Sequence, residues 1–442
     1  MNKLGHQKHG LNELNDITKP LSKLLSHIDD KGFTKASLAY RWYEASWFRD
    51  SSMMAIGLCK AAEFLRSSQD PRYLESETAA GSIIKFLWGS LDKFHPNIER
   101  ALSVDITSDR FKRLENHIPA RIGEDGGYFS CIQEGMPYSD AKEDNKYIRL
   151  RQYDSVPLTI MATEIIIDTA GENALGASTR RNIRSNLVDL TAYMLKVYKT
   201  ASANAWELDD DEVHSYTVAS ISRGIRSAVS IAERLGIDLS SLGDLDEKVC
   251  EIDRFIKETF VRDDILFKSA TSSGGVSVAA EPIRQVDASA IFVFTLFKPQ
   301  IGKNVETATI ERLEADLFNG NVLPIRYLED TYFSGGRWPL LGLEFAKYYA
   351  ERGDTESAYR IIKYVEEQYL NITGDGTIPE QELVNPAHPN EDLDNWFKKN
   401  GNRVIGELGW AAAEYLMAVV AYDKAVKEAA GKEALAAAVR EK

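Results

Sequence analysis

Apolar residues recur with the period of an α-helix through most of the chain. Runs such as SSMMAIGLCKAAEFL (51–65), SIIKFLWGSLDKF (82–94) and ELGWAAAEYLMAVVAYDKAV (407–426) place apolar side chains three or four residues apart, whereas strand-like alternation is scarce. The pattern predicts about twelve helices. We expect them to begin near residues 10, 46, 72, 154, 178, 214, 244, 285, 304, 338, 355 and 406.

The connections between these helices alternate between short and long. Long connections are expected at 29–45, 95–153, 201–213, 262–284, 320–337 and 372–405. In an up-and-down helical array every second connection lies at the same end, so the long loops would all meet on one face. Six such hairpins closed into a ring make an all-α (α/α)6 toroid with a pocket on that face. An open helical solenoid is the alternative, and the lack of a short motif repeated from hairpin to hairpin disfavours it.

Composition and charge narrow the class of protein. The 442 residues are 44% hydrophobic and 27% charged, which is ordinary for a globular protein, and no apolar run is long enough to span a bilayer. The first residues lack the apolar stretch of a signal peptide, so we expect a cytoplasmic protein with no membrane partner. A net charge of −14 without a basic cluster argues against nucleic acid as a partner.

The domain organisation follows from the same pattern. We expect a single catalytic toroid over residues 1–425 and, over 426–442, a tail rich in Ala, Lys and Glu that is helical or frayed. Cys59, Cys131 and Cys250 are far apart in sequence, which predicts reduced thiols rather than a disulfide framework or a metal cluster. The chain has no P-loop, HExxH, CxxC or GxSxG motif, so we expect neither a cofactor nor a metal.

Aromatic, acidic and arginine residues gather on the predicted long loops. The clusters are YEASWFRD (43–50), GEDGGYFSC (123–131), RQYDS (151–155), NAWELDDDE (204–212), RYLEDTYFSGGRWPL (326–340) and GDGTIPEQE (374–382). Aromatic rings stack on the apolar face of a pyranose, while Arg and Asp form paired hydrogen bonds with its hydroxyls. The loops therefore predict a sugar-binding site.

Two carboxylates can hydrolyse a glycosidic bond without a cofactor, provided that one is protonated and the other ionised. We expect Glu207 to be the protonated acid, because Trp206 and Leu208 offer an apolar flank and the acidic run at 209–212 disfavours ionisation. That run could equally favour the start of the helix expected near 214. Glu380, in a turn bounded by Gly and Pro, is either the base that activates water or a solvated turn residue.

As a set, these motifs resemble the glucoamylases, glycoside hydrolase family 15, from about residue 43 to 415. In family order the matching residues are Tyr43, Trp47, Arg49 and Asp50; Trp206 and Glu207; Arg326, Tyr327, Glu329, Asp330, Tyr332 and Trp338; Glu380 and Gln381; and Gly409 and Trp410. The resemblance implies that Glu207 is the general acid and Glu380 the general base. With the RQYDS cluster added, the expected substrate-binding residues are Tyr43, Trp47, Arg49, Asp50, Asp154, Trp206, Arg326, Glu329, Asp330 and Trp338.

The resemblance also implies roles for the first cluster. Arg49 and Asp50 would bind the outer hydroxyls of a glucose ring, with Tyr43 near the developing oxocarbenium charge. From the residues alone, Asp50 could instead cap the helix that follows it. Two departures from the family are visible: Leu208 stands where fungal glucoamylases carry a second acid, and too few residues precede Tyr43 for the N-terminal β-sandwich of prokaryotic relatives.

The function that the resemblance implies is an inverting, exo-acting α-glucosidase releasing β-glucose from the non-reducing end of a short α-glucan. The linkage (α-1,4, α-1,6 or α,α-1,1), the substrate length and the oligomeric state stay open. Another (α/α)6 sugar enzyme, such as a trehalase, a kojibiose-type phosphorylase or an unsaturated-uronide hydrolase, is one alternative. A non-catalytic sugar-binding or regulatory domain is the other, and the presence of both Glu207 and Glu380 disfavours it.

Overall fold

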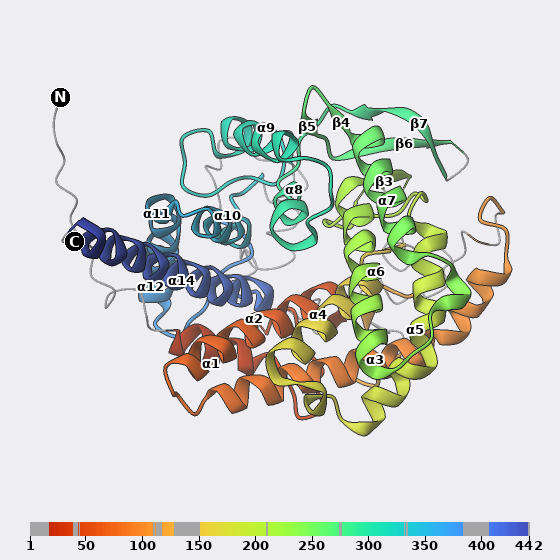
Figure 1. Ribbon diagram of the computed structural model, residues 1–442, viewed down its shortest axis with the longest axis horizontal. Coiled ribbons are helices and arrows are strands. Elements are labelled where there is room, and N and C mark those ends of the chain that lie inside the picture. The colour runs from red at the N-terminus through yellow and green to blue at the C-terminus, as the bar shows by residue number, and fades with distance from the viewer. Residues whose placement is uncertain are drawn as a thin grey trace, which may run out of the picture.

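The computed structural model describes residues 17–38, 43, 45–108, 111, 117–127, 151–208, 211–273, 276–330, 332, 335–382 and 406–440 (Figure 1). Six helical segments in these ranges form an inner ring: α2 (Phe48–Ser67), α4 (Ser155–Ala170), α6 (Ser215–Leu235), α8 (Ala290–Phe292) continued by η5 (Val293–Phe297), α10 (Pro339–Glu351) and α14 (Gly409–Arg440). Each packs against the next, and α14 packs against α2. The return of α14 to α2 closes the ring and excludes an open solenoid.

An outer layer of helices surrounds this ring. It comprises α1 (Thr18–Ser26), α3 (Tyr73–Ser103), α5 (Ala177–Val197), α7 (Leu245–Phe260), α9 (Lys303–Leu313) continued by η6 (Glu314–Phe318), and α11 (Thr355–Val365) continued by η8 (Glu366–Leu370). Among these, α1 packs on α14, α3 on α2, α7 on α6 and α11 on α10. Inner and outer helices alternate along the chain, so the fold is the all-α (α/α)6 toroid that the connection lengths predict.

Local sequence signals explain where several helices begin and end. The side chains of Asp244 and Asp354 accept hydrogen bonds from backbone N–H groups in the first turns of α7 and α11, at 3.0 Å in each case. Pro339 occupies the first turn of α10, where its missing N–H costs nothing. Gly236 ends α6 in a left-handed conformation with φ 63°. Short turns complete the helical inventory: η3 (Glu172–Ala174), η4 (Ser240–Leu242) and α12 (Asn371–Thr373).

The described residues form three small sheets beside the helices, and two of these sheets correct the sequence prediction. Strands β3 (Glu212–His214), β6 (Ser269–Ser273) and β7 (Val276–Ile283) form an antiparallel sheet, and β4 (Val261–Arg262) pairs with β5 (Ile265–Leu266). The predicted long loop at 262–284 is therefore largely strand. Its two longer strands, SATSS and VSVAAEPI, show no clear alternation of apolar and polar residues in the sequence.

The remaining pair of strands, β1 (Ser46–Trp47) and β2 (Arg121–Ile122), brings two distant loops together in an antiparallel register that places Trp47 opposite Arg121.

Two helix boundaries also differ from the prediction. Helix α3 continues through Pro96 to Ser103, because Ile98 and Ala101 keep its buried face packed beyond the proline. The helix expected near 285 begins at Ala290.

The other predicted starts lie within a few residues of the observed ones, except that the first expected helix falls partly outside the described residues and α1 begins at Thr18. Three further predicted features lie outside the described residues: Cys131, residues 209–210 of the acidic run and 383–405 of the last long connection.

Helix α14 extends through the predicted tail to Arg440. Within the described ranges, no helix combines the length and apolar character needed to span a membrane.

Candidate active site

The predicted site residues gather at the amino ends of the inner helices. Trp47 is the N-cap residue of α2, Asp154 that of α4 and Trp338 that of α10, while Glu207 lies in the connection to α6 and Glu380 in the connection to α14. Side chains from different connections contact one another across the ring. The long connections therefore meet on one face, as their alternation predicts.

Glu207 is held by two donors that come from the β1–β2 pair. Trp47 Nε1 donates to Glu207 Oε1 at 2.7 Å, and Arg121 Nη2 donates to Oε2 at 2.9 Å. The Arg121 guanidinium also lies 4.8 Å from the centre of the Trp47 ring. Both oxygens of the Glu207 carboxylate are thus engaged by side chains from one short ribbon.

The backbone at Glu207 is strained, with φ 63° in a residue that is not glycine. Asn204 holds this turn, because its side-chain oxygen accepts from the N–H groups of Trp206 at 2.8 Å and Leu208 at 3.0 Å. The turn aims the Glu207 side chain at Trp47 and Arg121 and leaves Leu208 39% exposed. Strain of this kind is typical of functional positions.

The expected reason for protonating Glu207 is wrong for the free site. Burial alone would raise the pKa of Glu207, but Arg121, Arg49 and the donated hydrogen bonds outweigh it and hold the pKa below its usual range. Leu208 does not form an apolar flank, since it faces solvent. Glu212, at the end of the acidic run, instead accepts a hydrogen bond from Ser269 at 2.6 Å.

Glu380 faces a different pair of donors. The hydroxyl of Tyr43 donates to Glu380 Oε1 at 3.2 Å and that of Tyr332 to Oε2 at 3.1 Å. The carboxyl is only 6% exposed, and burial raises its pKa to about 7 despite the opposing effects of Arg326 and the two hydroxyls. Glu380 is therefore not a solvated turn residue.

One aromatic pair joins the two carboxylates. The Tyr43 and Trp47 rings lie 5.3 Å apart, and each ring carries the donor for one carboxylate, Tyr43 for Glu380 and Trp47 for Glu207. Each carboxylate is thus bound by one ring of this pair. Their pKa values are pushed in opposite directions, which is the arrangement that separates an acid from a base.

Arg49 and Asp50 project from the first turn of α2 into the same site. Arg49 Nε donates to Asp154 Oδ2 at 2.9 Å, and its Nη1 donates to the carbonyl of Ala205. Among the described residues, Arg49 Nη2 and Asp154 Oδ1 are buried without a hydrogen-bond partner. The helix itself has Trp47 as N-cap and no side-chain cap, so Asp50 does not cap it. Burial raises the pKa of Asp50 to about 7, against the effect of Arg49.

Arg326 and Trp338 belong to an aromatic wall. Arg326 donates to both oxygens of Asp330, at 2.7 and 2.6 Å, which fixes the guanidinium plane. Its guanidinium lies 4.8 to 5.5 Å from the ring centres of Trp206, Tyr327, Tyr332 and Trp338. The Trp206 and Trp338 rings are 5.4 Å apart. These contacts bring together the residues preceding α6 and those preceding α10.

Two residues of the site, Asp287 and Arg121, were not predicted, Tyr332 was matched to the family without a role, and one predicted residue stands apart. Asp287 accepts from Trp206 Nε1 at 2.9 and 3.0 Å, Arg121 binds Glu207, and Tyr332 binds Glu380. Asp287 had a signal in the sequence, since RQVD at 284–287 repeats the RQYD of 151–154, each just ahead of an inner helix. Glu329 is exposed, with φ 71°, and none of the described side-chain contacts joins it to the others.

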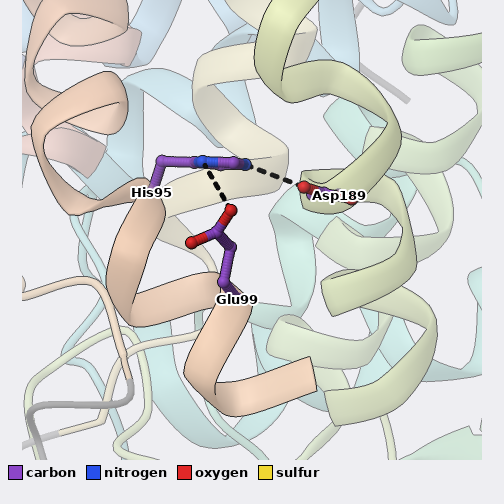
Figure 2. A group of neighbouring side chains, drawn as sticks. All are labelled: His95, Glu99 and Asp189. Carbon is purple, nitrogen blue, oxygen red and sulfur yellow. Dashed lines mark hydrogen bonds and ion pairs between the residues drawn. The ribbon is translucent and has the colours of Figure 1, made fainter. Parts of the chain in front are cut away.

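One group in the described part of the chain could geometrically hold a metal ion. His95 on α3 contacts Asp189 on α5 through Nε2 at 2.8 Å and Glu99 through Nδ1 at 3.8 Å (Figure 2). The two ring nitrogens face different carboxylates, so the imidazole acts as a bridge between them rather than as a ligand pointing at a shared centre. Both helices belong to the outer layer, and the contacts join α3 to α5.

The site combines two carboxylates, an aromatic wall and a buried Arg–Asp pair with unused hydrogen-bonding atoms. Arg49 Nη2 offers a donor and Asp154 Oδ1 an acceptor, which suits a ligand rich in hydroxyl groups. The rings of Trp206 and Trp338 offer apolar faces. The chemistry that this set can perform without a metal or cofactor is acid–base catalysis on a polyhydroxylated substrate.

Solved structures with a similar fold include several glycosidases. A glycosidase variant in complex with glucose has a TM-score of 0.73 and 20% identity, over 93% of this chain and 98% of that chain. The glucoamylase of Hormoconis resinae has a TM-score of 0.54 and 13% identity, over 91% of this chain and 72% of that chain. A glycoside hydrolase family 63 mannosylglycerate hydrolase from Thermus thermophilus has a TM-score of 0.50 and 13% identity, over 91% and 99%. No protein-family model and no curated protein sequence matches the chain.

Proposed function

We propose that this protein is an inverting, exo-acting α-glucosidase of the glucoamylase type, which releases β-glucose from the non-reducing end of a short α-glucan. The observation that carries the proposal is that Glu207 and Glu380 are bound by the adjoining rings of Trp47 and Tyr43, in environments that separate their pKa values. The similarity to glycosidases, one of them bound to glucose, supports the choice of a sugar substrate.

In this mechanism Glu207 protonates the glycosidic oxygen as the bond to the sugar carbon breaks. Glu380 takes a proton from the water that attacks the same carbon from the opposite face. The hydroxyl of Tyr43 lies between Glu380 and the Trp47 ring, where it can face the positive charge that develops on the glucose. Arg49 and Asp154 bind the outer hydroxyls through their unused polar atoms, and the carboxyl of Asp50 binds a further hydroxyl.

The proton must move when substrate binds. In the free site it favours Glu380, whose pKa is about 7, over Glu207, whose pKa is lowered. The productive form carries the proton on Glu207 instead, so the pair keeps the same total charge while its proton changes place. Substrate binding therefore has to weaken the hold of Arg121 and Trp47 on the Glu207 carboxylate.

A non-catalytic sugar-binding domain is the second candidate, and the lowered pKa of Glu207 is the observation that favours it. Glucose release from maltose, isomaltose, trehalose, maltotriose and soluble starch separates the two and identifies the linkage. We expect release from at least one of these substrates and none after Glu380→Gln. Binding of these sugars without any release by the unmodified protein would favour the second candidate.

A further inference from the structure

Arg121 lies at the more open side of the site. Its side chain is 21% exposed and that of Glu207 is 18% exposed, whereas the other arginine near Glu207, Arg49, is 4% exposed and already donates to Asp154 and Ala205. A ligand can therefore reach Arg121 without dismantling the buried part of the site. The β1–β2 pairing and the Trp47 ring hold the Arg121 guanidinium in place.

The chemistry of the reaction fixes which part of the substrate would meet Arg121. If Glu207 donates a proton to the glycosidic oxygen, the group beyond that oxygen must pass next to the Glu207 carboxylate. Arg121 binds the Oε2 atom of that carboxylate, and the exposed Leu208 follows it in the chain. The guanidinium of Arg121 attracts a negative group, and Leu208 adds no charge that would repel one, as a carboxylate at position 208 would.

The same arginine opposes the protonation that catalysis needs. Among the described residues, the charged and titratable groups with an electrostatic effect on Glu207 include Arg121 from β2, Arg49 and Asp50 from α2, and Tyr43 from the preceding segment. Of these, Arg121 donates directly to Glu207 and is the more exposed of the two cations. A second anion placed on Arg121 would compete for its N–H groups and, by its own charge, favour the protonated form of Glu207.

We propose that Arg121 binds an anionic group, a carboxylate or a phosphate, on the leaving part of the substrate, and in doing so releases Glu207 to carry the proton. The inference rests on the proposed function and names its substrate class: α-glucosides with an acidic leaving group. Glu207 then gives its proton to the leaving oxygen as the glycosidic bond breaks. Water forms the new bond to the sugar carbon, and its proton passes to Glu380, so the number of protons on the pair is unchanged.

The test compares substrates that differ only in this charge. The reducing disaccharide that is cleaved best is converted to its alditol, which is neutral, and to its aldonate, which carries a carboxylate on the same open-chain sugar. Trehalose and trehalose 6-phosphate form the corresponding pair for an α,α-1,1 linkage and for phosphate. We expect kcat/KM to be at least about tenfold higher for the anionic member of a pair, since a charge-assisted hydrogen bond is worth roughly that much. If only one pair shows the preference for its anionic member, that pair identifies the anion: a carboxylate for the aldonate, or a phosphate for trehalose 6-phosphate.

Arg121→Gln should reduce this ratio to about one, and Arg121→Lys should leave an intermediate ratio, because lysine keeps the charge but not the forked geometry. The matched control is Arg312→Gln, because Arg312 is an exposed arginine on α9 that pairs with Asp316. This variant should keep the wild-type ratio. For the neutral alditol, Arg121→Gln should also move the low-pH limb of the kcat/KM profile upward, because the pKa of Glu207, which is the lower of the two in the free site, rises. A role in folding alone would not move that limb.

Binding without turnover keeps the inference separate from the proposed function. Calorimetry with gluconate and with sorbitol should show at least about tenfold tighter binding of gluconate, and Arg121→Gln should abolish the difference. If no substrate is cleaved but gluconate is preferred, the proposed function fails and the anion subsite stands. Equal kcat/KM within both pairs, or a preference that survives Arg121→Gln, would overturn the inference.

Discussion

Glu207 and Glu380 form two walls of the candidate site and carry the same carboxyl group in opposite environments. On one wall Glu207 meets a guanidinium and an indole N–H, and its pKa lies below the usual range. On the other, Glu380 meets two tyrosine hydroxyls in a more buried position, and its pKa rises to about 7. Each carboxyl accepts two hydrogen bonds, so the number of donors does not explain the difference. The charge of the donors and the depth of burial do.

This comparison shows that the segments far away in sequence, rather than the flanking residues, set the proton affinity. Glu207 directly precedes an acidic run, yet Arg121 and Arg49, with the hydrogen bond from Trp47, hold its pKa down against the effect of burial. Glu380 has Gly, Pro and Gln as neighbours, yet Tyr43 and Tyr332 surround it. The catalytic roles depend on how these environments change when a sugar enters.

The largest expected effect comes from removing either carboxylate. Glu207→Gln removes the proposed proton donor and Glu380→Gln the proposed base, so each should lower kcat by at least about 100-fold. Glu382→Gln, two residues from Glu380 but bound to Tyr364 at 2.9 Å, is the matched control and should stay within about twofold of the wild type. Near-normal turnover by a folded Glu207 or Glu380 variant, on the best substrate, would refute that residue's assignment.

The next effect concerns the residues that bind the sugar between the walls. Asp50→Asn and Arg49→Lys should each lower kcat/KM by about 10- to 100-fold, because charge-assisted hydrogen bonds to hydroxyls are lost or misaligned. For Asp50→Asn the melting temperature should not fall, since the change removes a buried carboxyl whose pKa is raised to about 7. Intact catalysis with a large loss of melting temperature would mean that Asp50 serves the helix instead.

A smaller effect should follow from changing one donor on the Glu380 wall. Tyr332→Phe removes a hydrogen bond that stabilises the ionised form, so the pKa of Glu380 should rise by roughly 0.5 to 1 unit. The low-pH limb of the kcat profile should move upward by that amount, since the base acts only when ionised. Tyr364→Phe removes a comparable Tyr–Glu bond outside the site and should leave the profile where it was.

The last effect is on stability and not on catalysis. The pKa of Glu380 rises from 4.5 in the unfolded chain to about 7 in the fold, which corresponds to roughly 3 kcal/mol. The stability contributed by this raised pKa is fully present below pH 4.5 and is lost as the pH rises through 7. Melting curves at pH 5 and pH 8 should therefore show a smaller fall for Glu380→Gln than for the wild type. An equal fall in both would contradict the deep burial of Glu380.

The sequence is sufficient for the architecture because helical periodicity and connection length are properties of single segments. The starts of α2, α4, α6, α10 and α14 all fall within three residues of their predicted positions. The sheet at 261–283 is not predicted, because its strands are short and two of them form a hairpin without a strong apolar alternation. The predicted end of α3 falls too early, because tertiary packing beyond Pro96 outweighs the local penalty of a proline.

Within the site, residue types are predictable but their partners are not. The pairing of Arg49 with Asp154 and of Trp47 with Glu207 joins segments more than 100 residues apart. Arg121 carries no local signal, because only the β1–β2 register brings it to Glu207. The prediction of a protonated Glu207 is wrong for the free site for this reason, whereas Asp287 could be found from its RQVD repeat.

The most direct test of the central claim, a pair of carboxylates acting as acid and base on opposite faces of the sugar, is the configuration of the first product. Glu380 as a base requires carboxyls roughly 6.5 to 9.5 Å apart and a single displacement, whereas a nucleophilic carboxylate requires about 5 to 5.5 Å and retention. Proton NMR in the first minutes of hydrolysis, before mutarotation, distinguishes the two. We predict that β-glucose appears first from an α-linked substrate. If α-glucose appears first, the assignment of Glu380 as the base is wrong.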